Sequence, residues 1–296
     1  MDVIDDVDDE FVQELLRAQR PDLAELALRY VGRGWGNQLW RLGDELAIRL
    51  PRTDWGPEKL RKEQRWLPRF APRLPLPVPT PLHLNDASEL FPSPWAIVAW
   101  VPGDPADKAE ITDESSARVL AEFLRALHDE ELSASESHLE PSRVLRNAGC
   151  EFGEDLISAV GEDRVRELKE VWRDALSAPG WDAAPVWVHG DLHPANVVVS
   201  EGALSGVIDF GELGAGDPAT DLSAAWTLLP SGSAPRFLQL YGDVDADTIR
   251  RARGWAVRKG MFMTRMALNG LRGLPGGKPG WLPAGRNTLD RILEEC

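Results

Sequence analysis

The spacing of apolar positions in the first hundred residues predicts a short helix followed by a small sheet. Apolar residues at positions 11, 12, 15 and 16 share one side of an amphipathic helix over residues 9–18. Gly43-Asp44 is a favourable hairpin dipeptide between the last two of the strand patterns that follow. Those patterns occupy residues 26–32, 38–43 and 45–51. We therefore expect antiparallel strands to dominate the front of the chain.

A helix and a buried strand complete this front part. Residues 57–70 read as a helix with Pro57 at an early position. The proline-rich residues 74–82 are expected to form an extended linker. An apolar run then predicts a buried strand over residues 95–101, and Pro102-Gly103 ends it.

Beyond this strand the pattern changes to helices. Thr112 is a candidate N-cap for a helix that runs to about His128, and residues 151–178 are helical in character. Short β runs surround a loop within residues 186–210, and Asp217 is expected to cap the next helix, with Pro218 in its first turn.

Two parts of different character follow from this change of pattern. Residues 1–101 form a small β-rich part and residues 102–296 a larger helical part, so the predicted fold class is α+β. We expect a ligand cleft between them, at about residues 99–104, because clefts between such lobes are common binding sites.

Composition places the chain among ordinary globular proteins. Of its 296 residues, 43% are hydrophobic and 27% charged, which argues against large-scale disorder. No apolar run approaches membrane-spanning length, and the acidic N-terminus lacks the features of a secretory signal. The two cysteines, Cys150 and Cys296, favour free thiols over a disulfide framework or a zinc site. We therefore expect a cytoplasmic protein.

The net charge of −15 restricts the kinds of ligand that the chain is expected to bind. An acidic chain repels the nucleic-acid backbone, which makes nucleic-acid binding a poor hypothesis. The charge would suit a cationic ligand, although solubility explains it equally well.

The stretch VWVHGDLHPANVVVSEGALSGVIDFGE, residues 186–212, carries the candidate chemistry. Asp191 and Asn196 lie on a loop after a strand, and Asp209 lies at the end of a following hairpin. Amide and carboxylate oxygens are suited to Mg²⁺, and a carboxylate that is not needed by the metal can orient and deprotonate a hydroxyl. We expect these three side chains to meet at one end of a small sheet.

The segments HGDLHPAN and IDFGE resemble the catalytic loop and the metal motif of protein-kinase-like enzymes, in particular the aminoglycoside phosphotransferase family. The resemblance implies a two-lobed kinase-like fold and transfer of a phosphoryl group from ATP or GTP to a hydroxyl. It gives Asp191 the role of catalytic base, and Asn196 and Asp209 the role of Mg²⁺ ligands. It makes His189 a brace of the loop, and Asp221 a residue that binds the loop backbone.

The resemblance also assigns nucleotide contacts to the front part. Arg49 takes the place where this fold usually has a lysine for the α- and β-phosphates, and Glu63 is its expected ion-pair partner; a surface pair of little consequence is the alternative. Gly34 and Asn37, in the glycine-rich residues 32–37, would cover the phosphates. Backbone groups near Ala99 and Val101 would pair with the purine.

The acceptor stays open at this stage. The family name suggests an aminoglycoside, but an excess of basic residues over positions 245–278 does not suit a polycation. Alternative acceptors are a macrolide, a peptide antibiotic and a metabolite hydroxyl. Alternative functions of the chain are a phosphate hydrolase and a non-catalytic kinase-like binding module. Trp226 and Trp255 would line an apolar pocket or, more simply, pack in the core. We expect a monomer or a weak dimer.

Overall fold

A computed structural model describes residues 7–133, 136 and 145–294 of the chain. The N-terminal residues 1–6 and Cys296 lie outside the described residues, so the expectations on them are not addressed by the structure. The described chain divides into two compact units. Unit 1 comprises residues 1–72, 77–101 and 208–211, and unit 2 comprises residues 73–76, 102–207 and 212–296.

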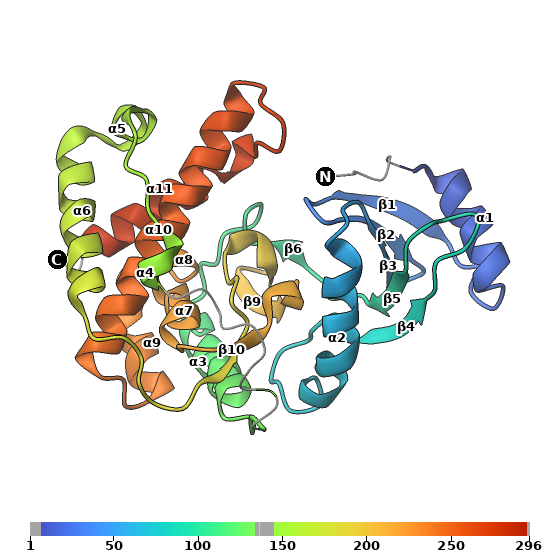
Figure 1. The fold of residues 1–296 in the computed structure, drawn as a ribbon, viewed down its shortest axis with the longest axis horizontal. Helices are drawn as coiled ribbons and strands as arrows, with labels where there is room; N and C mark the ends of the chain where they lie inside the picture. The colour runs from blue at the N-terminus through green and yellow to red at the C-terminus, as the bar shows by residue number, and fades with distance from the viewer. Residues whose placement is uncertain (1–6, 134–135, 137–144, 295–296) are drawn as a thin grey trace. The chain divides into compact units, whose positions relative to one another are not determined.

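Unit 1 contains a five-stranded antiparallel sheet in the order β1-β2-β3-β5-β4 (Figure 1). The predicted turn is present between β2 and β3, where Gly43 has a φ of 60°. Its elements are α1 (Asp9–Gln19), β1 (Leu28–Arg33), β2 (Asn37–Leu42), β3 (Leu46–Pro51), α2 (Gly56–Phe70), β4 (Pro81–Asn85) and β5 (Trp95–Ala99).

Side chains alternate between the two faces along each strand, so each face of this sheet has its own hydrophobic cluster. Ile48 packs in a cluster with Leu15 and Leu16 of α1, whereas the adjacent Ala47 packs in a cluster with Leu60 of α2. Successive strand residues point to opposite faces, so the two helices pack against opposite sides of the sheet.

One strand was missed by the sequence analysis. β4 begins at Pro81, inside the segment predicted as an extended linker, and pairs with β5. β4 is an edge strand of the sheet, where a proline that donates no hydrogen bond is tolerated.

Unit 2 is largely helical and contains two small sheets, one formed by β6, β8 and β9 and the other by β7 and β10. Its strands are β6 (Asp104–Pro105), β7 (Val186–Val188), β8 (Val197–Ser200), β9 (Ala203–Val207) and β10 (Gly214–Gly216). Its α-helices are α3 (Ser116–His128), α4 (Leu145–Ala148), α5 (Glu154–Val160), α6 (Glu162–Ser177), α7 (Ala219–Leu222), α8 (Ala224–Thr227), α9 (Ala234–Tyr241), α10 (Ala246–Leu271) and α11 (Leu282–Leu293). Short 3₁₀ turns lie at Pro194–Asn196, Phe210–Glu212 and Pro279–Trp281, and the second of them spans the division between the units.

Long helices dominate unit 2, and α10 is its central element. This helix packs against α6 and α11 (Figure 1). Trp226 and Trp255 are both buried in the core, the simpler of the two uses that the sequence suggested for them. The α+β architecture predicted from the sequence is therefore present.

Three helix boundaries differ from the prediction. Thr112 does not cap α3, which begins only at Ser116; the Asp113 carboxylate instead accepts a hydrogen bond from the Ser115 amide. The predicted helix over residues 151–178 is interrupted at Gly161, whose φ of 96° favours glycine. The helix after Asp217 starts one residue later than expected, and the Asp217 carboxylate accepts from the Ala219 amide.

Among the described residues, no helix combines the length and the apolar character that a membrane span requires.

Candidate active site

The loop that follows β7 holds Asp191 with its side chain 46% exposed to solvent. The strand itself ends in the buried residues Trp187 and Val188 and pairs with β10. Gly190 makes the turn possible: its φ is 83°, and a Cβ there would lie 2.7 Å from the carbonyl oxygen of Glu212. The local sequence thus turns the chain sharply and presents the next carboxylate to solvent.

The backbone before Asp191 is held by Asp221, as the sequence interpretation proposed. The fully buried Asp221 carboxylate accepts the amide of His189 at 2.6 Å and the amide of Gly190 at 2.9 Å. His189 in turn accepts the Asp191 amide on Nδ1 at 3.2 Å. Three consecutive loop amides therefore have partners, which satisfies donors that burial would otherwise leave unpaired.

Asp221 is itself oriented by His128, a residue that the sequence analysis did not assign. His128 Nε2 lies 3.2 Å from Asp221 Oδ2, and its Nδ1 lies 2.8 Å from the Tyr241 hydroxyl. Burial alone would raise the pKa of Asp221, but the hydrogen bond and charge of His128 hold that pKa below its usual range. The loop backbone is therefore bonded to an ionised carboxylate.

The Asp191 side chain is oriented by Asn196 and His193. Asn196 Nδ2 donates to the backbone oxygen of Asp191 at 2.9 Å and to its Oδ2 at 3.2 Å. His193 accepts the Ala195 amide on Nδ1, which places its proton on Nε2, 3.6 Å from Asp191 Oδ2. His193 was also missed by the sequence analysis, although it lies inside the HGDLHPAN motif.

These neighbours favour the ionised form of Asp191. Burial works against ionisation, but only in part, because nearly half of the side chain is exposed. The neighbouring imidazole of His193 and then the ammonium of Lys259 lower the pKa of Asp191 to about 2. At neutral pH this side chain is a carboxylate that can accept a proton.

Unit 1 brings together a second set of predicted residues. Arg49 on β3 forms an ion pair with the buried Glu63 of α2, so the expected pair is present and is not a surface pair. Arg49 Nη2 also lies 3.9 Å from Asp209 Oδ1, and Asn37, with its amide oxygen turned toward Arg49, accepts from Nη2 at 3.2 Å. Arg49 therefore links the glycine-rich loop to Asp209.

Asp209 has an unusual backbone conformation. Its φ is 60°, in the left-handed region that few non-glycine residues adopt, and its side chain is 51% exposed. The segment that carries it is bonded to α2, because Lys62 Nζ donates to the Gly211 carbonyl at 3.2 Å. The sequence analysis did not predict this contact of Lys62 with the Gly211 carbonyl. A strained, exposed carboxylate at a fixed position is typical of functional sites.

The glycine-rich loop and the predicted purine contacts depend on backbone amide and carbonyl groups. The Gly34 amide donates to the Asn37 carbonyl at 2.9 Å, and a Cβ on Gly34 would meet no atom closer than 3.8 Å. The Ala99 amide donates to Thr80 at 2.9 Å, so a purine could contact Ala99 only through its carbonyl. Val101 is buried at the end of unit 1.

The excess of basic residues on α10 is largely balanced by acidic partners from outside the segment. Not all of these residues are on a solvated helix face: Arg251 pairs with Asp217 at 2.7 Å and is buried. Three exposed pairs lie within 2.8 Å: Arg250–Asp174, Arg265–Glu151 and Arg272–Asp155. The local positive charge inferred from the sequence is therefore mostly neutralised.

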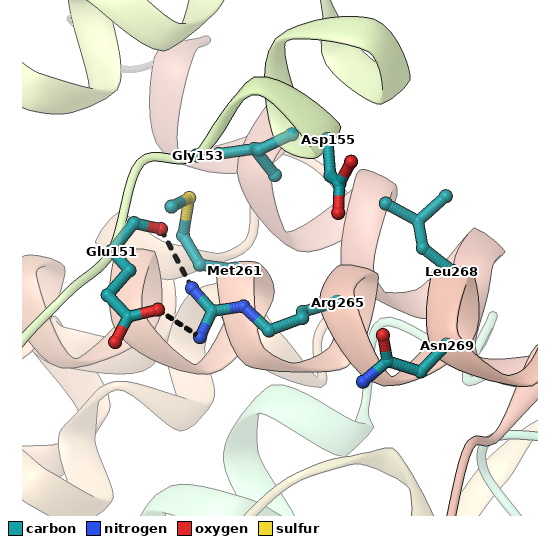
Figure 2. Close-up of a pocket in the computed structure, with 8 residues that line it drawn as sticks. Glu151, Gly153, Asp155, Met261, Arg265, Leu268 and Asn269 are labelled. Atoms are coloured by element: carbon teal, nitrogen blue, oxygen red, sulfur yellow. Dashed lines mark hydrogen bonds and ion pairs between the residues drawn. The ribbon is translucent and has the colours of Figure 1, made fainter. Parts of the chain in front are cut away.

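A cavity of about 260 Å³ lies between α10 and the start of α5 (Figure 2). Dashed lines in Figure 2 join Arg265 to Glu151, and both residues line the cavity. Residues 261, 265 and 268 lie about 200° around the helix from residues 259, 263 and 266. Met263 and Met266 belong to the cluster that includes Ala195, which lies on the same loop as Asp191. This cavity therefore faces away from Asp191. Its lining is Glu151, Gly153, Asp155, Leu156, Met261, Arg265, Leu268 and Asn269.

Comparison with known sequences identifies relatives of the chain. The phosphotransferase enzyme family matches residues 6–255. An aminoglycoside 3'-phosphotransferase of Escherichia coli is 27% identical over 235 residues, which cover 75% of this chain and 76% of that protein. A viomycin phosphotransferase of Streptomyces vinaceus is 31% identical over 201 residues, 64% of this chain and 68% of the relative.

Solved structures share the fold over nearly the whole chain. The GDP and kanamycin complex of APH(2")-IIia has a TM-score of 0.67 and 21% identity, covering 96% of this chain and 98% of that one. The macrolide 2'-phosphotransferase MphH of Brachybacterium faecium has a TM-score of 0.60 and 23% identity, covering 95% and 97%. The family match over most of the chain, together with the relatives and the shared fold, gives the assignment: the chain belongs to the phosphotransferase enzyme family and is a small-molecule kinase.

Proposed function

We propose that this kinase transfers the γ-phosphoryl group of ATP or GTP to a hydroxyl of an antibiotic, with an aminoglycoside-like molecule as the first candidate. The observation that carries the proposal is the geometry of Asp191. Its carboxylate is ionised and half exposed, and Asn196 and His193 orient it on a loop whose amides are held by Asp221.

In this proposal Asp191 is the catalytic base. It accepts a hydrogen bond from the acceptor hydroxyl, orients the oxygen toward the γ-phosphorus, and takes the proton as the new O–P bond forms. The bond between the γ-phosphorus and the bridging oxygen breaks, and the nucleoside diphosphate leaves. His193 Nε2, 3.6 Å from Asp191 Oδ2, helps to keep the carboxylate in the orientation that receives the proton.

By their chemistry, the side-chain oxygen atoms of Asn196 and Asp209 each suit Mg²⁺, and we propose both residues as its ligands. The Asn196 amide nitrogen is committed to Asp191, so its Oδ1 is the atom that would ligate a metal, and the exposed Asp209 carboxylate is a second hard oxygen ligand. When bound, Mg²⁺ neutralises charge on the phosphates. Two protein ligands are enough, because Mg²⁺ normally takes its others from phosphate and water.

Nucleotide binding is proposed for the front of the chain. Arg49 would contact the α- and β-phosphates, with its guanidinium held by Glu63. Gly34 and Asn37 would cover the phosphates. The purine would pair with the backbone carbonyl of Ala99 and the amide of Val101. In support, solved relatives of the same fold are known as complexes with GDP, ADP or ATP.

The acceptor class rests on relatives whose names include aminoglycoside, viomycin and macrolide phosphotransferases. The net charge of −15 favours a cationic acceptor among these, and the neutralised charges of α10 remove the sequence-based argument against one. We propose that residues 130–180 and 230–296 build the acceptor pocket; part of the first segment lies outside the described residues.

The test is nucleotide consumption with ATP and GTP, each with Mg²⁺, against kanamycin, gentamicin, viomycin, a macrolide and no acceptor. Acceleration by an antibiotic, with a phosphorylated product in the mass spectrum, is the expected result. Equal consumption without any acceptor would instead indicate a hydrolase. Nucleotide binding without consumption would indicate a binding module, and both outcomes would overturn the proposed function.

A further inference from the structure

Lys259, in the middle of α10, is a buried cation that directly contacts the catalytic loop. The residue is only 7% exposed. Nζ donates to the Leu192 carbonyl at 3.1 Å, the Thr220 carbonyl at 3.0 Å and Ser223 Oγ at 2.9 Å. An ammonium group has three donors, and here each has one acceptor.

The position of these acceptors matters more than their number. Leu192 directly follows Asp191, whereas the amides before Asp191 are bonded to Asp221. Thr220 and Ser223 flank Asp221 on α7 and at its C-terminal end. The backbone is therefore fixed on both sides of Asp191, on one side by a buried anion and on the other by a buried cation.

The helix that carries Lys259 is itself closely packed. A Cβ on the adjacent Gly260 would lie 2.8 Å from the Leu289 side chain, and one on Gly285 of α11 would lie 2.8 Å from the Thr264 amide. The two glycines let α10 and α11 approach closely. The backbone that carries Lys259 is therefore held in place, as is required of a residue that positions another residue.

Burying this cation has a cost that packing alone does not explain. Burial lowers the pKa of Lys259 to about 8, although Asp221 and Asp191 oppose the shift. A methionine would fill similar space without desolvating a charge. A lysine at this place is therefore better explained by what its ammonium contacts than by core packing.

We propose that Lys259 is a positioning residue for phosphoryl transfer. Its hydrogen bond to the Leu192 carbonyl holds the Asp191 carboxylate at the position where it contacts the acceptor hydroxyl. The inference rests on the proposed role of Asp191. It predicts that loss of the ammonium slows the chemical step and leaves nucleotide binding intact, because none of its hydrogen bonds reaches Arg49, Asn196 or Asp209.

The test compares Lys259→Met with Val165→Ala, which shortens a buried side chain of α6, a helix that packs against α10, α5 and α11. Rates are measured with the antibiotic that the wild type phosphorylates best. Lys259→Met should lower kcat about 10- to 100-fold, the loss expected for a misplaced reacting group, with the KM for nucleotide unchanged. Val165→Ala should lower the melting temperature and leave kcat unchanged.

A milder variant guards against a misfolded Lys259→Met. Ser223→Ala removes one of the three acceptors and keeps the cation, and it should lower kcat about 2- to 10-fold, the equivalent of one hydrogen bond, at constant KM for nucleotide. Unchanged kcat in both variants, or a kcat loss in Val165→Ala that matches its loss of stability, would overturn the proposal.

Hydrogen–deuterium exchange separates this inference from the proposed function. Lys259→Met should accelerate exchange in the peptide that contains residues 189–196, and Val165→Ala should not. If no acceptor in the panel is phosphorylated, the proposed function fails, and unchanged exchange in Lys259→Met would independently show that Lys259 does not hold the loop.

Discussion

The catalytic loop, residues 189–196, and the glycine-rich loop, residues 32–37, are held in opposite ways. Side chains from three helices fix the catalytic loop: Asp221 and Lys259 bind its backbone, and His128 orients Asp221. The glycine-rich loop has fewer such contacts: Gly34 bonds to Asn37, Arg49 donates to Asn37, and Arg52 Nη1 donates to the Gly34 carbonyl at 3.3 Å.

The difference corresponds to the two proposed tasks. A general base must be positioned accurately relative to one atom of the acceptor, so a loop that carries it should be preorganised in the absence of ligand. A loop that covers phosphates must admit and release a nucleotide, so weak local contacts suit it. Substitutions in the two loops should therefore differ in what they damage.

The largest expected effect is on the rate of Asp191→Asn. Asparagine is nearly isosteric, and it cannot accept the proton. We expect kcat to fall by about 10²–10⁴-fold with the best acceptor, the usual contribution of a general base. The melting temperature should stay close to that of the wild type, since the side chain is half exposed. Full activity in this variant would remove Asp191 from the mechanism.

Asp221→Ala should destabilise the fold more than any substitution in the glycine-rich loop. It removes the buried acceptor of two backbone amides and the larger of the two anionic contributions, from Asp221 and Asp191, that support the charge of Lys259. A loss of about 3–5 kcal/mol is typical when one partner of a buried charged cluster is removed. Urea unfolding measures it; a loss below 1 kcal/mol would mean that the loop is not held in this way.

Gly190→Ala should cost less stability, about 1–3 kcal/mol, because the residue would have to keep a φ of 83° and its Cβ would meet the Glu212 carbonyl. The turn would shift, so kcat should fall together with stability. Thermal unfolding and steady-state rates on the same sample check both effects.

Gly34→Ala is the matched substitution in the glycine-rich loop and should have the smallest effect on stability, within about 0.5 kcal/mol, since nothing crowds a Cβ there. Its expected effect is a higher KM for nucleotide at unchanged kcat. If Gly34→Ala destabilised the protein as much as Gly190→Ala, the contrast between the loops would be wrong.

The sequence predicted those parts of the site that are contiguous in the chain. Asp191 and Asn196 lie on one loop, and a single motif of eight residues specifies their relative geometry. The Arg49–Glu63 pair was expected from the family resemblance, and two consecutive elements of the chain, β3 and α2, carry it. Local patterns also predicted most strands of that sheet, since alternation reports the two faces directly.

The parts that the sequence did not reveal depend on distant contacts. His128 is 93 positions from Asp221, and Lys259 is 67 positions from Leu192, so no local pattern marks either residue. Lys259 also lies in a basic segment that resembles a solvated helix face. β4 was missed because its proline suggests a linker, and Thr112 because its capping role is taken over by a turn around Asp113.

The central claim, that Asp191 acts on the acceptor while Asp209 acts on the metal–nucleotide complex, is tested most directly by calorimetry. Binding of ATP and GTP is measured with and without Mg²⁺ for the wild type, Asp191→Asn and Asp209→Asn. The account predicts Mg²⁺-dependent binding that Asp191→Asn retains and Asp209→Asn weakens. Binding that is lost equally in both variants, or that is independent of Mg²⁺ in the wild type, would contradict it.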